Sequence, residues 1–121
     1  MTLNEYQEQA MSTCMETTRN YSYMMGNLVA EVGELQGKVS KAQRKGKLTF
    51  NRRGEIVWLG TVEEWAQFDN ELMKEAGDIL WQLAGLCTVS GWALENIGQG
   101  NLSKLASRQE RGVIDGNGDN R

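Results

Sequence analysis

The chain has 121 residues, a net charge of −3 and neither histidine nor proline, and its length suits a single domain. The acidic balance argues against binding of polymeric nucleic acid, which usually needs a basic excess, and the missing histidine removes most zinc sites and the usual general base. No apolar run approaches the roughly 20 residues of a membrane span, and no signal peptide is visible. We therefore expect a cytoplasmic protein, in a cell or in one infected by a virus, with Cys14 and Cys87 reduced.

Two helices are predicted in the first part of the chain. The first runs from about Leu3 to Thr18 and opens with a capping box formed by Thr2 and Glu5. The second runs from about Tyr21 to Lys45, with cations in its last turns, where they suit the helix dipole. Gly46 then provides a C-terminal stop.

Residues 47–60 break the helical pattern. Leu48–Phe50 and Ile56–Trp58 are short apolar runs of extended character, and a polar stretch that contains glycine separates them. This pattern predicts an ordered loop or a short β-hairpin.

Two more helices are predicted in the second part. Thr61 and Glu64 form another capping box, and the helix that follows should reach about Ser90. The last helix runs from about Leu94 to Gln109. We expect an all-α protein with four helices, one domain over residues 1–112 and a C-terminal tail over residues 113–121, which are rich in Gly, Asp and Asn.

Two acidic motifs lie on the two longest predicted helices. Glu31 and Glu34 form E-x-x-E, and Glu75 and Asp78 form E-x-x-D. Residues three apart share a helix face, and both motifs interrupt apolar stripes. Four carboxylates that face the core are therefore predicted, although a solvated face is the usual alternative for such a motif.

Carboxylates on a core-facing stripe are costly unless they are paired or bound to a metal. Lys38 and Lys74 are close enough in sequence to neutralise two of them. A divalent cation suits four converging carboxylates better, and ligation by oxygen alone favours Mg²⁺ or Mn²⁺ over zinc. A di-iron bundle is excluded because its Glu-x-x-His motifs need histidine.

The two acidic motifs, in this order, resemble the MazG-like, all-α nucleoside-triphosphate pyrophosphatase superfamily. The similarity continues through Asn101, Lys104 and Arg108 to the end of the chain, and includes Tyr6 and Gln7 near its start. It therefore covers nearly the whole sequence. A single copy of the acidic pair indicates a single-domain form, and residues 47–60 match no motif of the superfamily.

The resemblance implies Mg²⁺-dependent hydrolysis of nucleoside or deoxynucleoside triphosphates between the α- and β-phosphates. Glu31, Glu34, Glu75 and Asp78 would hold Mg²⁺, with Mn²⁺ as a possible substitute. Either Glu31 or Glu34 would take the proton of the attacking water, and spacing does not choose between them.

A bundle completed by dimerisation is also expected. Helices of about 25 residues are roughly 38 Å long, and one short chain would cover their apolar faces poorly. We predict a homodimer, and the resemblance implies a homotetramer made of two dimers, with sites built from two chains.

The resemblance assigns phosphate binding to one face of the last helix, formed by Asn101, Lys104 and Arg108. A solvated surface is the alternative. Trp81 and Gln82 would meet the base, although Trp81 suits the core equally well, and Gln7 is a weaker candidate for the same contact.

Two rival functions stay open. A non-enzymatic helical oligomerisation or regulatory module would explain the helices but not the acids within apolar stripes. A phosphoribosyl-ATP pyrophosphohydrolase would share the metal chemistry and differ in the pocket for the base.

Overall fold

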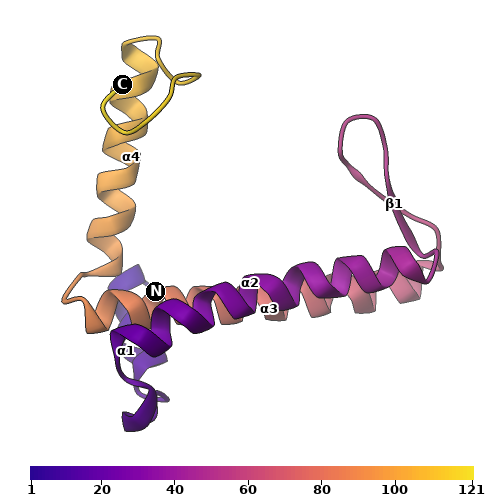
Figure 1. Ribbon diagram of the computed structural model, residues 1–121, viewed down its shortest axis with the longest axis horizontal. Coiled ribbons are helices and arrows are strands. Elements are labelled where there is room, and N and C mark those ends of the chain that lie inside the picture. Colours follow the sequence, from indigo (N-terminus) through magenta and orange to yellow (C-terminus); the bar gives the residue numbers. More distant parts are fainter.

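The computed structural model describes residues 1–121 and is mostly helical, which confirms the predicted fold class (Figure 1). Two long antiparallel helices lie side by side and form the body of the molecule. The other helices and the hairpin are attached at the two ends of this pair. The elements in chain order are α1 (Leu3–Met11), a 3-10 turn (Glu16–Thr18), α2 (Tyr21–Arg44), β1 (Leu48–Phe50), β2 (Ile56–Trp58), α3 (Val62–Val89) and α4 (Leu94–Glu110).

Side-chain caps fix the starts of three helices. In the capping box of α1, Glu5 N donates to Thr2 Oγ1 at 3.1 Å and Thr2 N donates to Glu5 Oε2 at 2.7 Å. Thr61 accepts from Glu64 N at 3.1 Å at the start of α3. These bonds satisfy backbone donors that a helix start leaves without partners. They confirm the predicted capping box of α1, whereas at α3 the Thr61 cap is present without the reciprocal bond from Thr61 N to the Glu64 side chain.

Helix α1 ends at Met11, so the predicted extension to Thr18 is wrong. Ser12 Oγ donates to Gln9 O at 2.6 Å and Thr13 Oγ1 donates to Ala10 O at 2.7 Å. Such local side-chain bonds compete with helical backbone bonds. The chain then turns, because Arg19 reaches back to donate to Met11 O at 2.8 Å.

Residues 48–58 form an antiparallel β-hairpin with Leu48 opposite Trp58 and Phe50 opposite Ile56. Asn51 Oδ1 closes the turn by accepting from Arg53 N and Glu55 N, both at 2.9 Å. Of the two predictions for this stretch, the hairpin is therefore correct. It stands at the end of the helix pair that is distant from α1 and α4 (Figure 1).

Two separate hydrophobic clusters hold the long helices together. The first lies where α1 meets the pair and is formed by Met11, Met24, Ala84, Leu86, Cys87 and Leu94. The second lies beside the hairpin and is formed by Val39, Ala42, Leu48 and Phe68. The middle of the α2–α3 pair lies between these clusters, and it carries the two acidic motifs.

Helix α4 projects away from the pair and its C-terminal extension folds back onto it (Figure 1). Gly112 has a φ of 68°, which allows the chain to reverse. The predicted tail therefore has a defined path along α4, while its separation from the domain at residue 112 stays a prediction.

Candidate functional site

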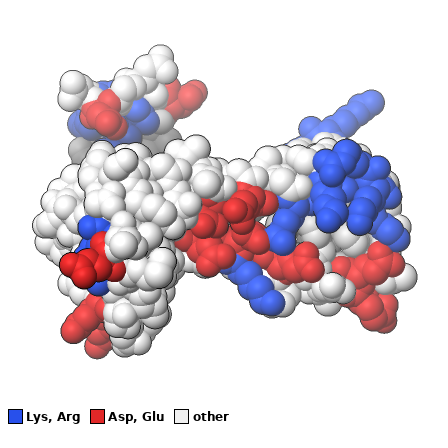
Figure 2. All heavy atoms as spheres, turned by 60° about the horizontal axis from the view of Figure 1, so that its bottom comes forward, with Lys and Arg blue, Asp and Glu red and all other residues white.

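Three acidic side chains converge halfway along the helix pair. Carboxylate oxygens of Glu31, Glu34 and Glu75 lie within 4.8 Å of one another. They come from facing helices, α2 and α3, and acidic side chains gather at the waist of the molecule (Figure 2). The predicted convergence of the two motifs is therefore present for three of the four acids.

The two members of each motif differ in burial. Glu31 and Glu75 are half-buried, whereas Glu34 and Asp78 are exposed. Asp78 does not join the trio, but it lies near enough that its charge acts on two neighbours. Burial raises the pKa of the Tyr6 hydroxyl, and the Asp78 charge raises it further.

Glu31 is oriented by Asn27, which lies one turn earlier on α2 and donates from Nδ2 to Glu31 Oε1 at 3.0 Å. Burial raises the pKa of the Glu31 carboxyl, and repulsion from Glu34 and Asp78 adds to the shift. The trio therefore holds more negative charge than its surroundings neutralise.

One lysine partly compensates this charge. Lys38 Nζ lies 3.2 Å from Glu75 Oε1 and 3.9 Å from Glu71 Oε2, so its predicted role as a neutralising partner is confirmed. Lys74 forms no ion pair, although the same role was predicted for it.

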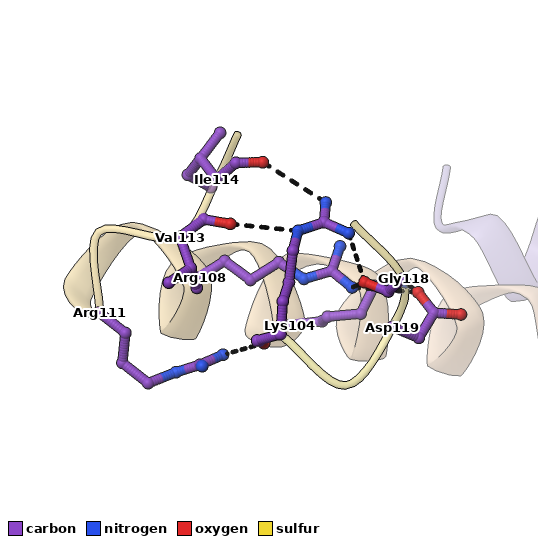
Figure 3. A network of polar contacts seen from close by, with 8 residues as sticks. Lys104, Arg108, Arg111, Val113, Ile114, Gly118 and Asp119 are labelled. Atoms are coloured by element: carbon purple, nitrogen blue, oxygen red, sulfur yellow. Dashed lines mark hydrogen bonds and ion pairs between the residues drawn. The ribbon is translucent and has the colours of Figure 1, made fainter. Parts of the chain in front are cut away.

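The predicted phosphate-binding residues lie on α4, apart from the acids of the same chain (Figure 1). Arg108 donates to Asp119 Oδ1 at 3.0 Å and to Gly118 O at 3.2 Å, and Lys104 donates to Asp119 Oδ1 at 3.4 Å (Figure 3). Asp119 thus forms ion pairs with both cations, whereas the side chain of Asn101 is exposed and has no hydrogen-bond partner.

The predicted base contacts lie near α1. Trp81 Nε1 donates to Ala10 O and to Thr13 Oγ1, both at 3.1 Å, which favours the core role for this tryptophan. Gln82 is 4% exposed, and its Oε1 is a buried acceptor without a hydrogen-bond partner within the chain.

Gln7 joins α1 to the start of α4. Its Oε1 accepts from Leu94 N at 2.7 Å, and its Nε2 donates to Thr88 Oγ1 at 2.9 Å and to Trp92 O at 3.0 Å. These bonds give it a structural role, and its contact with a base stays a prediction.

Sequence reasoning missed Asn27 as a residue of the site. Its place four residues before Glu31 was the available signal, because side chains at that spacing meet on a helix. The Tyr6 hydroxyl near Asp78 was also missed, since no spacing rule connects separate helices.

A family model, the MazG nucleotide pyrophosphohydrolase domain, matches residues 19–113. The chain belongs to the MazG family. The match includes both acidic motifs and begins after α1. The MazG chain is also similar to the Gene 37 protein of Mycobacterium phage L5, with 35% identity over 108 residues, which are 88% of this chain and 81% of the phage protein.

No solved structure matches this MazG protein. None of its helices combines the length and the apolar character that a bilayer crossing requires.

The residues present fit a divalent metal, on which MazG-family enzymes depend. Three carboxylates within 4.8 Å offer only hard oxygen ligands, which magnesium and manganese prefer. A bound cation would also relieve the repulsion that raises the pKa of Glu31.

Proposed function

We propose that this MazG protein hydrolyses nucleoside or deoxynucleoside triphosphates between the α- and β-phosphates in a reaction that depends on Mg²⁺. The products are a nucleoside monophosphate and pyrophosphate. The observation that carries the proposal is the approach of Glu31, Glu34 and Glu75 to within 4.8 Å in a chain of this family.

The four acids have different roles in the proposed reaction. Magnesium, when bound, supplies positive charge to phosphate oxygens and lowers the pKa of a water. Glu31, oriented by Asn27, and Glu75 act as its ligands, and Asp78 completes the acidic set at the exposed edge. Glu34 is exposed and has no hydrogen-bond partner, so its carboxylate is free to accept the proton of the attacking water.

A second copy of the chain would complete the site. The structure has 8,517 Å² of accessible surface, against about 6,600 Å² expected for a compact monomer of this mass. Large apolar side chains stay exposed on all four helices, among them Val29 and Val32 on α2 and Leu102 and Leu105 on α4. We infer a homodimer, or a tetramer of two dimers, in which α4 of one chain brings Asn101, Lys104 and Arg108 to the acids of another.

The direct test is a substrate panel with product identification. Each canonical nucleoside and deoxynucleoside triphosphate, together with phosphoribosyl-ATP, is incubated with the protein and Mg²⁺. We expect a monophosphate and pyrophosphate from at least one triphosphate. Turnover of phosphoribosyl-ATP alone would favour the related enzyme, and no turnover of any compound by folded protein would contradict the proposal.

Substitution of the acids provides the matched experiment. Glu75→Gln and Asp78→Asn should lower turnover by at least about a hundredfold because they remove metal ligands, with no loss of helicity in circular dichroism. Asp69→Asn is the control, since Asp69 is an exposed acid of α3 without an ion pair. Magnesium titration by calorimetry should show binding heat that Glu75→Gln abolishes, whereas a non-enzymatic module would show none.

A further inference from the structure

Basic side chains gather beside the acidic patch, on the hairpin side of the helix pair (Figure 2). Seven of the 13 lysines and arginines lie between residues 38 and 53, and no acid lies in that interval. None of these cations is a ligand in the proposed metal site, so that site does not explain their concentration.

Three of the lysines continue the face of α2 that carries the acids. Lys38, Lys41 and Lys45 follow Glu34 by four, seven and eleven residues, so they lie on one helix face. At 1.5 Å per residue they lie about 6, 10 and 17 Å further along the axis. This face of α2 therefore changes from acidic to basic in the direction of the hairpin.

A cavity of about 320 Å³ opens along this basic stretch, between α2, α3 and the hairpin. Its lining includes four lysines, Lys38, Lys41, Lys45 and Lys47. Lys47 is paired with Glu64 at 2.9 Å and Lys38 with Glu75 at 3.2 Å. Lys41 and Lys45 form no ion pair and are exposed, so their charges are available to a ligand.

The aromatic floor of this cavity is not free for a nucleobase. Phe68 is buried and stacks on Trp58 with ring centroids 5.1 Å apart, and Trp65 packs against both rings. Because these faces already contact one another, the charged groups that the cavity offers are the four ammonium groups and one carboxylate, that of Glu71, which lies 3.9 Å from Lys38. That chemistry suits a compact anion better than an aromatic ring.

From this geometry we propose that a set of lysines binds the β- and γ-phosphates of the substrate and then the pyrophosphate that leaves. Lys41 is the main contact, Lys38 assists it, and Lys45 lies further away. This inference rests on the proposed function and fixes the direction of the substrate. The phosphate tail points along α2 toward the hairpin, and the nucleoside points toward α1 and Gln82.

The reaction explains why cations are needed there. Water attacks the α-phosphorus, the bond from that phosphorus to the bridging oxygen breaks, and its electron pair leaves on pyrophosphate, while the proton of the water passes to Glu34. Negative charge therefore grows on the departing oxygens. Lysine ammonium groups that donate to these oxygens stabilise that charge.

The test uses inorganic pyrophosphate as the probe, titrated into the whole protein in the presence of Mg²⁺ and followed by calorimetry. Lys41→Ala should weaken pyrophosphate binding about tenfold, as expected for the loss of one charged hydrogen bond, and Lys45→Ala should weaken it less. Arg44→Ala is the matched control, because Arg44 has the same charge on the same helix but does not line the cavity. It should change the affinity less than twofold.

A nucleoside monophosphate provides the second readout, because it lacks the terminal phosphates. Its affinity should be unchanged in Lys41→Ala. Equal effects of Lys41→Ala and Arg44→Ala on pyrophosphate, or weakening by Lys104→Ala alone, would overturn the inference and leave the hydrolysis proposal intact. The protein could instead bind pyrophosphate with this dependence on the lysines and yet hydrolyse no triphosphate. That result would support the anion site and contradict the proposed function.

Discussion

Gly85 shows how a single residue sets the contact between the long helices. It faces Met24, whose side chain is completely buried in the cluster next to α1. A Cβ at position 85 would overlap with Met24 Sδ and would lie 2.8 Å from its Cε. The absence of a side chain at Gly85 is therefore what allows methionine to fill this part of the core.

Gly85→Ala should lower the free energy of unfolding by about 1–3 kcal/mol, the usual effect of overpacking a filled core. Chemical denaturation at one fixed protein concentration measures this change, because an oligomer's stability depends on concentration. Gly100→Ala on α4 is the control, since nothing lies within 4 Å of its added Cβ. It should instead stabilise by about 0.4–1 kcal/mol, and equal effects of the two changes would contradict the overlap.

The sequence could predict that the two acidic motifs meet, but not that Asp78 stays outside the trio or how deeply each acid is buried. Three residues advance a helix by about 300°, so the second acid of a motif is rotated about 60° from the first. That rotation places Glu31 and Glu75 at the edge of the core and leaves Glu34 and Asp78 in solvent. The partners Asn27 and Tyr6 depend on rotamers and on helix packing, which spacing alone does not specify.

At the level of elements, the C-terminal extension is held on α4 by charge. Arg108 is buried, and its guanidinium donates to the exposed Asp119 carboxylate. The hydrogen bond from Arg108, with the nearby charge of Lys104, holds the pKa of Asp119 below its usual range. Further bonds from Arg121 to Val113 O and from Arg111 to Arg121 O close the extension (Figure 3).

The docking of this extension should depend on pH. Because the pKa of Asp119 is lowered in the docked state, its contribution is fully present above the ordinary aspartate pKa and is lost as pH falls through the lowered value. Backbone ¹⁵N relaxation should therefore show residues 112–121 ordered at neutral pH and increasingly mobile as the pH falls below the ordinary aspartate pKa, while α4 stays helical.

Asp119→Asn should release the extension already at neutral pH, since it removes the charge that Arg108 and Lys104 share. Asp115→Asn is the control, because Asp115 forms no ion pair with either cation. An extension that stays ordered in Asp119→Asn would show that the backbone contacts of Arg121 are sufficient by themselves.

The long elements were predictable because their signals are local and repeated. Helices α2 and α3 begin at side-chain caps, and α2, α3 and α4 each end just before a glycine with positive φ, so their bounds agree with prediction to within about two residues. Helix α1 was predicted too long, since Ser12 and Thr13 bond to the preceding turn and the distant Arg19 captures Met11 O. The contact between Arg19 and Met11 O forms only in the folded chain, so local sequence signals could not predict it.

At the level of the whole molecule, a single chain leaves many of its apolar side chains exposed. Only 13 of the 121 residues are buried, and α4 extends away from the pair with its apolar side chains uncovered (Figure 1). The apolar pattern predicted four helices correctly but not this open arrangement, because sequence periodicity does not distinguish a face covered within the chain from one covered by a second copy.

Leu102→Glu should shift the protein toward monomers, because a charge in a buried apolar contact is costly. Leu102 is 62% exposed on α4. Sedimentation at several concentrations measures the change, and turnover should fall together with assembly. Val62→Glu, at a 79% exposed residue at the start of α3, is the control at the opposite end. An unchanged distribution in Leu102→Glu would remove α4 from the interface.

The separation of the two hydrophobic clusters also affects where the folded chain opens locally. Local openings follow the distribution of apolar contacts, and regions with few of them exchange their amide hydrogens fastest. The waist that bears the acidic motifs lies between the two firmly packed ends. Small changes in the spacing of its helices can therefore occur while both ends keep their packing.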